Sequence, residues 1–191
     1  MKFTPLPLAG AHVISLAPKT DDRGYFVRTF CARAFAEAGL ESRFVQTNRS
    51  FSARRGTLRG FHYQLPPSAE VKLVQCTRGA VHDVIVDLRP DSPSFLQSCA
   101  IELSDSSATG LYVPRGCAHG FVTLTDDVEI HYQVSAAHDP AAERGLRHDD
   151  PALAVHWPRA AASLSDKDRS WPDFDPVYHG TEALRGLLEA A

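Results

Sequence analysis

Short runs that alternate between apolar and polar residues dominate the middle of the chain. A repeat of two residues is typical of β-strands that turn one face toward a core. Turn residues such as Arg78-Gly79 separate these runs, and no helical pattern falls between them. The pattern predicts strands at residues 44–48, 59–64, 71–76, 80–88, 98–103, 111–113, 120–124 and 128–134. This many short strands in succession indicate an all-β antiparallel sandwich or barrel.

The two ends of the chain differ from this middle part. Residues 3–16 predict an edge strand and residues 25–30 a further strand, and the alanine-rich segment 31–38 predicts a short helix that stops at Gly39. After residue 136, loops rich in proline and aspartate lead to a helical turn within 163–170. A terminal helix is expected at 181–190, with Leu184, Leu187 and Leu188 on one face that packs against the domain or a partner subunit.

Length and charge narrow the class of protein. The 191 residues fit one domain spanning 1–191. The net charge of -3 and the absence of a basic run argue against nucleic acid as a partner. No apolar stretch approaches the roughly 20 residues of a membrane span, and the N-terminus does not resemble a secretory signal. Four cysteines without a CxxC spacing indicate reduced thiols, so we expect a cytoplasmic protein.

Three side chains in the predicted strands carry candidate chemistry. Alternation places Tyr132 on the same face as Ile130 and Lys72 on the same face as Val74, so both are predicted to point into the barrel. A buried lysine needs an anionic partner, and the alternative is an edge lysine that reaches solvent. His62 lies in the run Arg59-Gly60-Phe61-His62-Tyr63-Gln64, where it is either a catalyst or a hydrogen-bonded structural histidine.

The segment Pro114-x-Gly116-x-x-His119 resembles the second signature of the cupin barrels. Metal-binding cupins usually take two histidines and a glutamate from a first signature. Here that region offers His62, a glutamine at position 64, and Glu70 near the place of a carboxylate ligand. Together with His119 this is a poor ligand set for a transition metal. The resemblance therefore implies a cupin-type double-stranded β-helix, or jelly roll, with a few short peripheral helices and no metal.

Several further motifs are similar to those of the dTDP-4-dehydrorhamnose 3,5-epimerase family. They run in order from about residue 20 to residue 170 and include 56–64, Lys72-Leu73-Val74, 79–87, 113–121, 143–147 and Leu164-Ser165-x-Lys167-Asp168. The resemblance implies isomerisation of a nucleotide-linked 4-keto-6-deoxyhexose at C3 and C5, without a cofactor. It implies His62 as the base, Asp168 as the carboxylate that orients it, Lys72 as the stabiliser of the enolate and Tyr132 as the acid. Asp168 could instead serve a capping box that begins at Ser165.

The resemblance also implies a binding site for the nucleotide sugar. Arg59 and Arg23 suit the diphosphate, because an arginine can bind it bidentately. The remaining substrate-binding candidates are Phe26, Gln46, Asn48, His119, His138 and Glu143. Family members are homodimers that exchange strands, so Arg23 and Phe26 would serve the neighbouring subunit's site. Core packing is the alternative for Phe26.

Some positions depart from the family pattern. Arg28 stands where a glutamate is common, and His138 stands where a tyrosine stacks on the thymine; His82 and His148 replace other aromatic residues. Altered substrate recognition is therefore an open alternative: a C3- or C5-only epimerase, or one that uses another nucleotide sugar. A cupin that only binds a nucleotide sugar would be a protein of a different class. A metal-dependent cupin oxygenase or isomerase is a third possibility.

Overall fold

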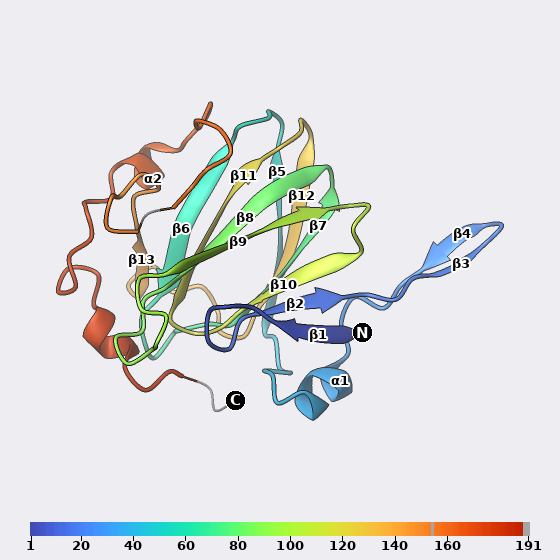
Figure 1. Cartoon of the computed structure of the whole chain (residues 1–191), viewed down its shortest axis with the longest axis horizontal. Helices are drawn as coiled ribbons and strands as arrows, with labels where there is room; N and C mark the ends of the chain where they lie inside the picture. Colours follow the sequence, from blue (N-terminus) through green and yellow to red (C-terminus); the bar gives the residue numbers. More distant parts are fainter. Residues whose placement is uncertain (154, 189–191) are drawn as a thin grey trace.

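Two antiparallel sheets face each other in the computed structural model, which describes residues 1–153 and 155–188 (Figure 1). The six-stranded sheet has the order β1-β2-β10-β7-β12-β5. Its strands are β1 (Lys2–Pro5), β2 (His12–Ser15), β10 (Thr109–Val113), β7 (Lys72–Arg78), β12 (Val128–Val134) and β5 (Gln46–Ser52). The five-stranded sheet has the order β13-β6-β11-β8-β9. Its strands are β13 (Glu143–Gly145), β6 (Leu58–Gln64), β11 (Cys117–Thr123), β8 (Ala80–Asp87) and β9 (Ser98–Ser104). This is the predicted cupin-type jelly roll.

Apolar side chains fill the space between the sheets and also cover both outer faces. Val74, Ile130 and Ile85 belong to the cluster between the sheets. A second cluster joins Phe61 and other outward residues of the five-stranded sheet to the C-terminal segment. On the outer face of the six-stranded sheet, Phe35 of α1 (Ala32–Glu37) packs in a third cluster. Because both faces are covered, strands such as β7 and β8 are buried on both sides, and in these strands apolar residues interrupt the alternation.

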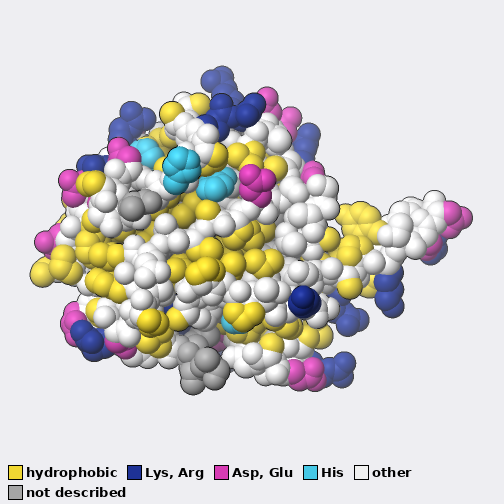
Figure 2. Space-filling view, viewed as in Figure 1, with side chains coloured by type: hydrophobic (Ala, Val, Ile, Leu, Met, Phe, Trp, Pro, Cys, Tyr) yellow, Lys and Arg dark blue, Asp and Glu magenta, His cyan; other side chains and the backbone are white. Residues whose placement is uncertain are grey.

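A two-stranded arm projects from this body, and Figures 1 and 2 show it clear of the sheets. It consists of β3 (Lys19–Asp21) and β4 (Gly24–Phe26). Tyr25 is 70% exposed and Phe26 is 68% exposed. Phe26 therefore does not belong to the core of its own chain. An isolated hairpin is at best marginally stable in water, so this arm needs a surface to pack on.

Most predicted elements are present, with some shifted ends. The edge strand expected at 3–16 is two strands, β1 and β2; the strand at 25–30 is limited to β4, and β5 begins and ends later than expected. The helical turn within 163–170 is α2 (Asp166–Arg169). The prediction of a terminal helix at 181–190 is wrong. Thr181–Leu184 forms a 3₁₀ turn, and residues 185–188 are not helical. Residues 189–191 lie outside the described residues. Gly186, with φ of 79°, interrupts the segment.

The C-terminal segment packs on the body despite having no long helix. Leu184 is fully buried in the cluster beside β6, and Leu187 packs against the same cluster. Tyr63 Oη donates a hydrogen bond to the carbonyl oxygen of His179 at 2.7 Å. These contacts hold the C-terminal segment against β6, while one domain over residues 1–191 stays a prediction. None of the helices in the described part of the chain is long and apolar enough to cross a membrane.

Candidate active site

A cavity of about 340 Å³ lies between the two sheets near β5, β6, β7 and β12. It continues into a smaller cavity of about 150 Å³. His62, Lys72 and Tyr132 line both of them. The remaining lining residues of the larger cavity include Gln46, Asn48, Gln64, Glu70, His138 and Glu143, and those of the smaller one include Arg59 and His119.

His62 stands on the wall formed by the five-stranded sheet. It pairs across β6 and β11 with His119, so the two histidines are cross-strand neighbours. The two strands approach very closely at this point: a Cβ at Gly60 would lie 2.5 Å from the Cα of Gly120. Gly60 also has a φ of 106°, a conformation that side chains disfavour. Glycine at position 60 therefore allows β6 to approach β11 closely beside His62.

Asp168 reaches His62 from α2, 106 residues further along the chain. The Nε2 atom of His62 lies 2.6 Å from the Oδ1 atom of Asp168. Ser165 caps this short helix by accepting a hydrogen bond from the backbone N–H of Asp168 at 3.0 Å. The Asp168 carboxylate contacts His62 and the backbone N–H of Gly60. Residue 168 thus serves the cap with its backbone and the histidine with its side chain.

The surroundings of Asp168 fix its charge. Burial opposes ionisation, but the hydrogen bonds from His62, Ser165 and Gly60 outweigh it and hold the pKa of Asp168 below its usual value. A carboxylate can only accept hydrogen bonds, so His62 Nε2 carries the proton between them. In a neutral imidazole with its proton on Nε2, the Nδ1 atom of His62 has the lone pair. This is the tautomer that a general base requires.

Tyr132 and Lys72 stand on the opposite wall, on adjacent strands of the six-stranded sheet. Tyr132 pairs with Val74 of β7, two residues from Lys72. Burial raises the pKa of Tyr132, with Arg59 opposing the rise and Glu70 adding to it, so the side chain is a neutral phenol. The cavity therefore has an imidazole on one wall and a neutral phenol on the other.

Lys72 points between the sheets, as its strand position predicts. Its side chain is only 11% exposed and lies 3.1 Å from Glu70, which is the anionic partner that burial requires. The Lys72 Nζ atom also donates to the carbonyl oxygen of His62 at 2.9 Å. The solvent-facing alternative for Lys72 is wrong.

Two further polar side chains, Arg59 and His119, face the smaller cavity. Arg59 donates to Ser52 Oγ at 3.1 Å and to the carbonyl oxygen of Phe51 at 3.1 Å, so it spans from β6 to β5. His119 Nε2 lies 2.7 Å from the Oδ1 atom of Asp83, a carboxylate with no solvent exposure. Both side chains are held in place by these contacts, and the Arg59 guanidinium can donate to an anionic ligand.

The mouth of the larger cavity carries more exposed polar groups. Lys167 and His138 both contact the Glu143 carboxylate, His138 at 3.3 Å. Burial opposes ionisation of Glu143, but Lys167, His138 and His62 together lower its pKa. The Gln46 side chain donates to Asn48 at 2.9 Å and accepts from the backbone of His138. The mouth is thus polar, while the interior holds the acid–base groups.

Comparison of the chain with known proteins identifies one family. The family model described as dTDP-4-dehydrorhamnose 3,5-epimerase matches residues 5–176. The chain belongs to this family. The dTDP-4-dehydrorhamnose 3,5-epimerase of Pseudomonas aeruginosa is 44% identical over 91% of this chain and 96% of its own length. The resemblance stated from the sequence motifs is therefore confirmed.

Solved structures of the family have the same fold. The dTDP-4-dehydrorhamnose 3,5-epimerase of Bacillus anthracis, solved with TDP and pyrophosphate bound, is 39% identical and superimposes with a TM-score of 0.88 over 91% of this chain and 99% of that one. A 3'-monoepimerase from Streptomyces bikiniensis, solved with dTDP-quinovose, is 33% identical with a TM-score of 0.84 over 97% of this chain and 91% of that one. The family thus includes enzymes named for one carbon and for two.

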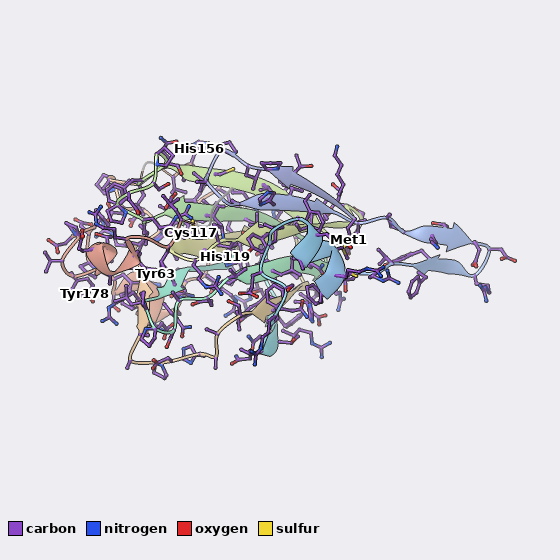
Figure 3. All side chains as sticks on the ribbon, turned by 90° about the horizontal axis from the view of Figure 1, so that it is seen from below. Met1, Tyr63, Cys117, His119, His156 and Tyr178 are labelled. Carbon is purple, nitrogen blue, oxygen red and sulfur yellow. The ribbon has the colours of Figure 1, made fainter. Side chains whose placement is uncertain are left out.

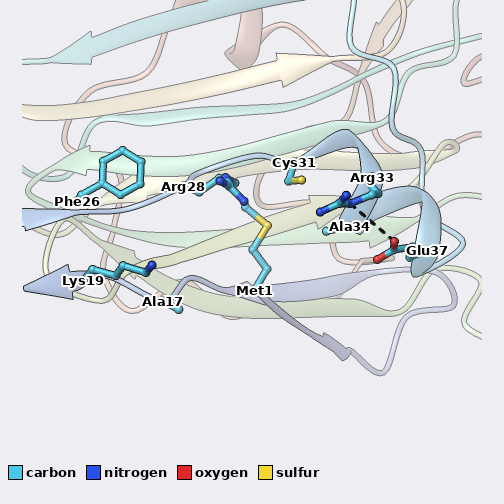
Figure 4. Close-up of a pocket in the computed structure, with 9 residues that line it drawn as sticks. All are labelled: Met1, Ala17, Lys19, Phe26, Arg28, Cys31, Arg33, Ala34 and Glu37. Atoms are coloured by element: carbon cyan, nitrogen blue, oxygen red, sulfur yellow. Dashed lines mark ion pairs between the residues drawn. The ribbon is translucent and has the colours of Figure 1, made fainter.

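Ten of the twelve site residues expected from the epimerase motifs lie at these cavities or contact a residue that does. Arg23 and Phe26 do not, because both lie on the arm. Arg23 pairs with Asp21 at 2.6 Å. Phe26 and Arg28 line a separate hollow of about 270 Å³ at the base of the arm (Figure 4). Figure 3, in a perpendicular view, again shows the arm extending away from the body that holds His119.

Two departures from the epimerase pattern lie away from the cavities. His82 shares the outer face of β8 with Val84 and Val86, and its ring lies 6.2 Å from that of Trp157. The carbonyl of His148 accepts a hydrogen bond from Trp157 at 2.8 Å. Neither histidine lines the cavities that hold His62. His82 and His148 therefore lie at the outer face of the five-stranded sheet, whereas His138 lies at the mouth of the larger cavity.

Sequence reasoning misses several residues of the site. Asp83, the partner of His119, and Lys167, the partner of Glu143, lie in the quoted motifs without an assigned role. From the sequence, Glu70 is considered only as a candidate metal ligand. In the structure its two carboxylate oxygens contact Lys72 and Gln64. No group of three or more His, Cys, Asp or Glu side chains in residues 1–153 and 155–188 is placed to hold a metal ion. Only proximity in the fold could reveal these pairs.

Proposed function

We propose that this protein is a dTDP-4-dehydrorhamnose 3,5-epimerase that works by acid–base chemistry without a metal. Its substrate is a dTDP-linked 4-keto-6-deoxyhexose, and C3 and C5 are inverted. The placement of His62 and Tyr132 on opposite walls of one cavity carries the proposal. Inversion of a carbon needs a proton removed from one face and returned to the other, and these two residues supply both sides.

Each inversion begins at a C–H bond next to the 4-keto group. The Nδ1 lone pair of His62 takes the proton, and Asp168 stabilises the imidazolium that forms. The electrons of the C–H bond move to the C4 oxygen, giving an enolate. The Lys72 ammonium stabilises this oxyanion electrostatically. Because these groups are already fixed by hydrogen bonds, little reorganisation is needed when charge develops.

The phenol of Tyr132 then returns a proton to the opposite face of the carbon. The enolate electrons form the new C–H bond, and the sugar carbon is inverted. The enzyme is left with protonated His62 and a Tyr132 phenolate, which exchange protons with water before the next turnover. Every inversion therefore brings one solvent hydrogen into the product.

The nucleotide has matching partners around the cavity. Arg59 is the proposed contact for the diphosphate, and His119 for the sugar. Gln46, Asn48 and Glu143 at the mouth suit hydroxyl and base groups, and His138 lies where a ring could cover the base. The Bacillus anthracis structure is solved with TDP and the Streptomyces bikiniensis structure with dTDP-quinovose, which supports this class of ligand.

A homodimer that exchanges its arms completes the site in this proposal. The exposed Tyr25 and Phe26 on the arm need an apolar surface, and a second copy of the chain supplies it. Arg23 and Phe26 then belong to the neighbouring subunit's nucleotide site. The location proposed is the cytoplasm, which the thiol form of all four cysteines supports.

Proton exchange in deuterated water tests the reaction. Chelator-treated protein is incubated with dTDP-4-keto-6-deoxyglucose, and the C3 and C5 signals are followed by NMR. The proposal predicts deuterium and inversion at both carbons for the wild type, and neither for His62→Ala. His156→Ala is the matched control, because His156 is exposed at the edge of the molecule (Figure 3) and should leave the rate unchanged. Dependence on an added metal would contradict the proposal.

Inversion at one carbon is the second candidate. The Streptomyces niveus relative, 38% identical over 88% of this chain, is named a dTDP-4-dehydrorhamnose 3-epimerase, which supports this alternative. The same experiment separates the two, since deuterium at C3 alone identifies a mono-epimerase. No exchange at either carbon, with binding retained, identifies a nucleotide-sugar-binding cupin.

Mixed dimers test whether two subunits share a site. One variant carries His62→Ala and the other carries Arg23→Ala with Phe26→Ala, so each homodimer lacks part of every site. A mixed dimer has one complete site. After subunits are exchanged by dilution and mixing, we expect roughly a quarter of wild-type activity to return. No recovery, with mixed dimers demonstrated by native mass spectrometry, would show that each site belongs to one chain.

A further inference from the structure

Glu70 lies beside the cavity but takes no part in the mechanism above. Its side chain is 6% exposed, and its Oε1 atom lies 3.1 Å from the Lys72 Nζ atom. Its Oε2 atom accepts a hydrogen bond from Gln64 Nε2 at 3.0 Å. Both carboxylate oxygens are therefore engaged by donors from the protein.

The protein partners of Lys72 use two of the three N–H donors of its ammonium group. An ammonium has three N–H donors, and here one goes to Glu70 and one to the carbonyl oxygen of His62. In the described residues the third donor has no partner, and Lys72 lines both cavities. The two contacts thus hold the ammonium so that its remaining donor is available to a ligand oxygen.

Glu70 is itself held by a chain of contacts that begins at the mouth. The backbone N–H of Asp139, next to His138, donates to Gln64 Oε1 at 2.6 Å. The Gln64 amide group also donates to the carbonyl oxygen of Ser68 at 2.8 Å. These bonds fix which way the amide of Gln64 faces, so its Nε2 atom must face Glu70. The carboxylate therefore has a defined position.

We propose that Glu70 is a positioning residue that holds the Lys72 ammonium at the enolate oxygen. This inference rests on the proposed function, since it assigns the support of Lys72 in that reaction. Without the carboxylate, a largely buried charge loses its counterion, and the lysine side chain gains rotamer freedom. Stabilisation of the enolate needs a donor in one place, so the loss falls on the chemical step more than on binding.

The test is a double-mutant cycle of Glu70→Gln and Lys72→Met. An amide at position 70 offers one acceptor oxygen to the two donors that the carboxylate serves. We expect Glu70→Gln to lower kcat about 10- to 100-fold while KM changes less than about threefold. In the Lys72→Met background, Glu70→Gln should change kcat less than about twofold, because it acts through Lys72.

Stability gives a readout that is independent of activity. In the wild-type background, Glu70→Gln should lower Tm, because the buried Lys72 ammonium loses its counterion. In the Lys72→Met background, the same substitution should raise Tm, because it removes a buried carboxylate that has lost its cationic partner. Glu41→Gln is the matched control: Glu41 pairs with Arg115 at 2.6 Å outside the cavities, and kcat should be unchanged. Equal losses of kcat in both backgrounds would overturn the positioning role of Glu70 but leave the proposed function standing. Absence of exchange in the wild type would overturn the proposed function, and the inference with it.

Discussion

Replacing Asp168 by asparagine is the sharpest test of how His62 is made a base. The side chain at position 168 is 5% exposed, and its Oδ1 atom lies 2.6 Å from His62 Nε2. Asparagine has nearly the same size, so the cavity keeps its shape. Its amide, however, can donate a hydrogen bond to Nε2, which moves the imidazole proton to Nδ1. The atom that should take the substrate proton then carries one already.

The magnitude follows from what this tautomer contributes. A positioned general base contributes about 10²- to 10⁴-fold to a rate, and loss of the correct tautomer removes most of that contribution. The variant also loses the charge that stabilises the imidazolium. We therefore expect kcat to fall by about 10²- to 10⁴-fold, or about 2.7 to 5.4 kcal/mol of transition-state stabilisation, with a small change in KM.

The assay is the initial rate of deuterium uptake at C3 and C5, measured with saturating substrate. Asp166→Asn is the matched control, since Asp166 is an exposed carboxylate in the same short helix. It should retain the wild-type rate. A fall of less than about threefold in kcat for Asp168→Asn would refute the assignment, because it would show that His62 needs no charged partner.

Other perturbations test the remaining parts of the site. Tyr132→Phe should slow inversion, measured by NMR, at least about 10²-fold, while exchange through His62 persists. Gly60→Ala should destabilise the protein by about 3 kcal/mol in urea unfolding, because of its close approach and positive φ, whereas Gly39→Ala, with open space around its Cβ, should cost about 1 kcal/mol. His138→Tyr should lower KM for the dTDP-sugar in steady-state assays and leave kcat unchanged, since it adds stacking area at the mouth.

Stability should also depend on the charge of Asp168. Its pKa is lowered in the folded protein from the usual 3.8, so ionisation stabilises the fold above that pH, and the contribution is lost as pH falls through the lower folded-state value. The difference in unfolding free energy between the wild type and Asp168→Asn should therefore shrink as the pH falls below the usual value of 3.8. Urea unfolding across this range measures it. A difference that is constant with pH would contradict an ionised Asp168.

The strands of the jelly roll could be predicted because each has a buried face. The exceptions have physical reasons. β13 is a strand of three residues, Glu143–Gly145, too short for alternation to be visible. The predicted terminal helix rested on Leu184, Leu187 and Leu188, yet Gly186 adopts a positive φ inside that stripe. Burial of Leu184 beside β6 decides the structure of this segment, and a helical pattern alone does not describe that contact.

The candidate site was only partly visible in the sequence for a related reason. Strand faces predicted that Lys72 and Tyr132 point inward, but the roles of these residues came from family motifs and stay predictions. Pairs such as His119 with Asp83 are separated by 36 positions. No local pattern indicates that such residues meet, because the register of β8 against β11 and the twist of the sheet bring them together. The anionic partner of Lys72 was expected on energetic grounds, and the structure supplies it as Glu70.

Burial separates the positions that depart from the family pattern at the cavity mouth and after the arm from the proposed catalytic positions. Asp168 and Lys72 have side chains 5% and 11% exposed, and each contacts other polar groups, so replacing either one leaves a buried partner unsatisfied. His138, by contrast, has a side chain 54% exposed at the mouth, and Arg28 is exposed on the segment after the arm. Substitutions at these two positions cost little folding free energy. The departures at the proposed nucleotide site therefore fall where the fold tolerates them, and the proposed acid–base groups lie where it does not.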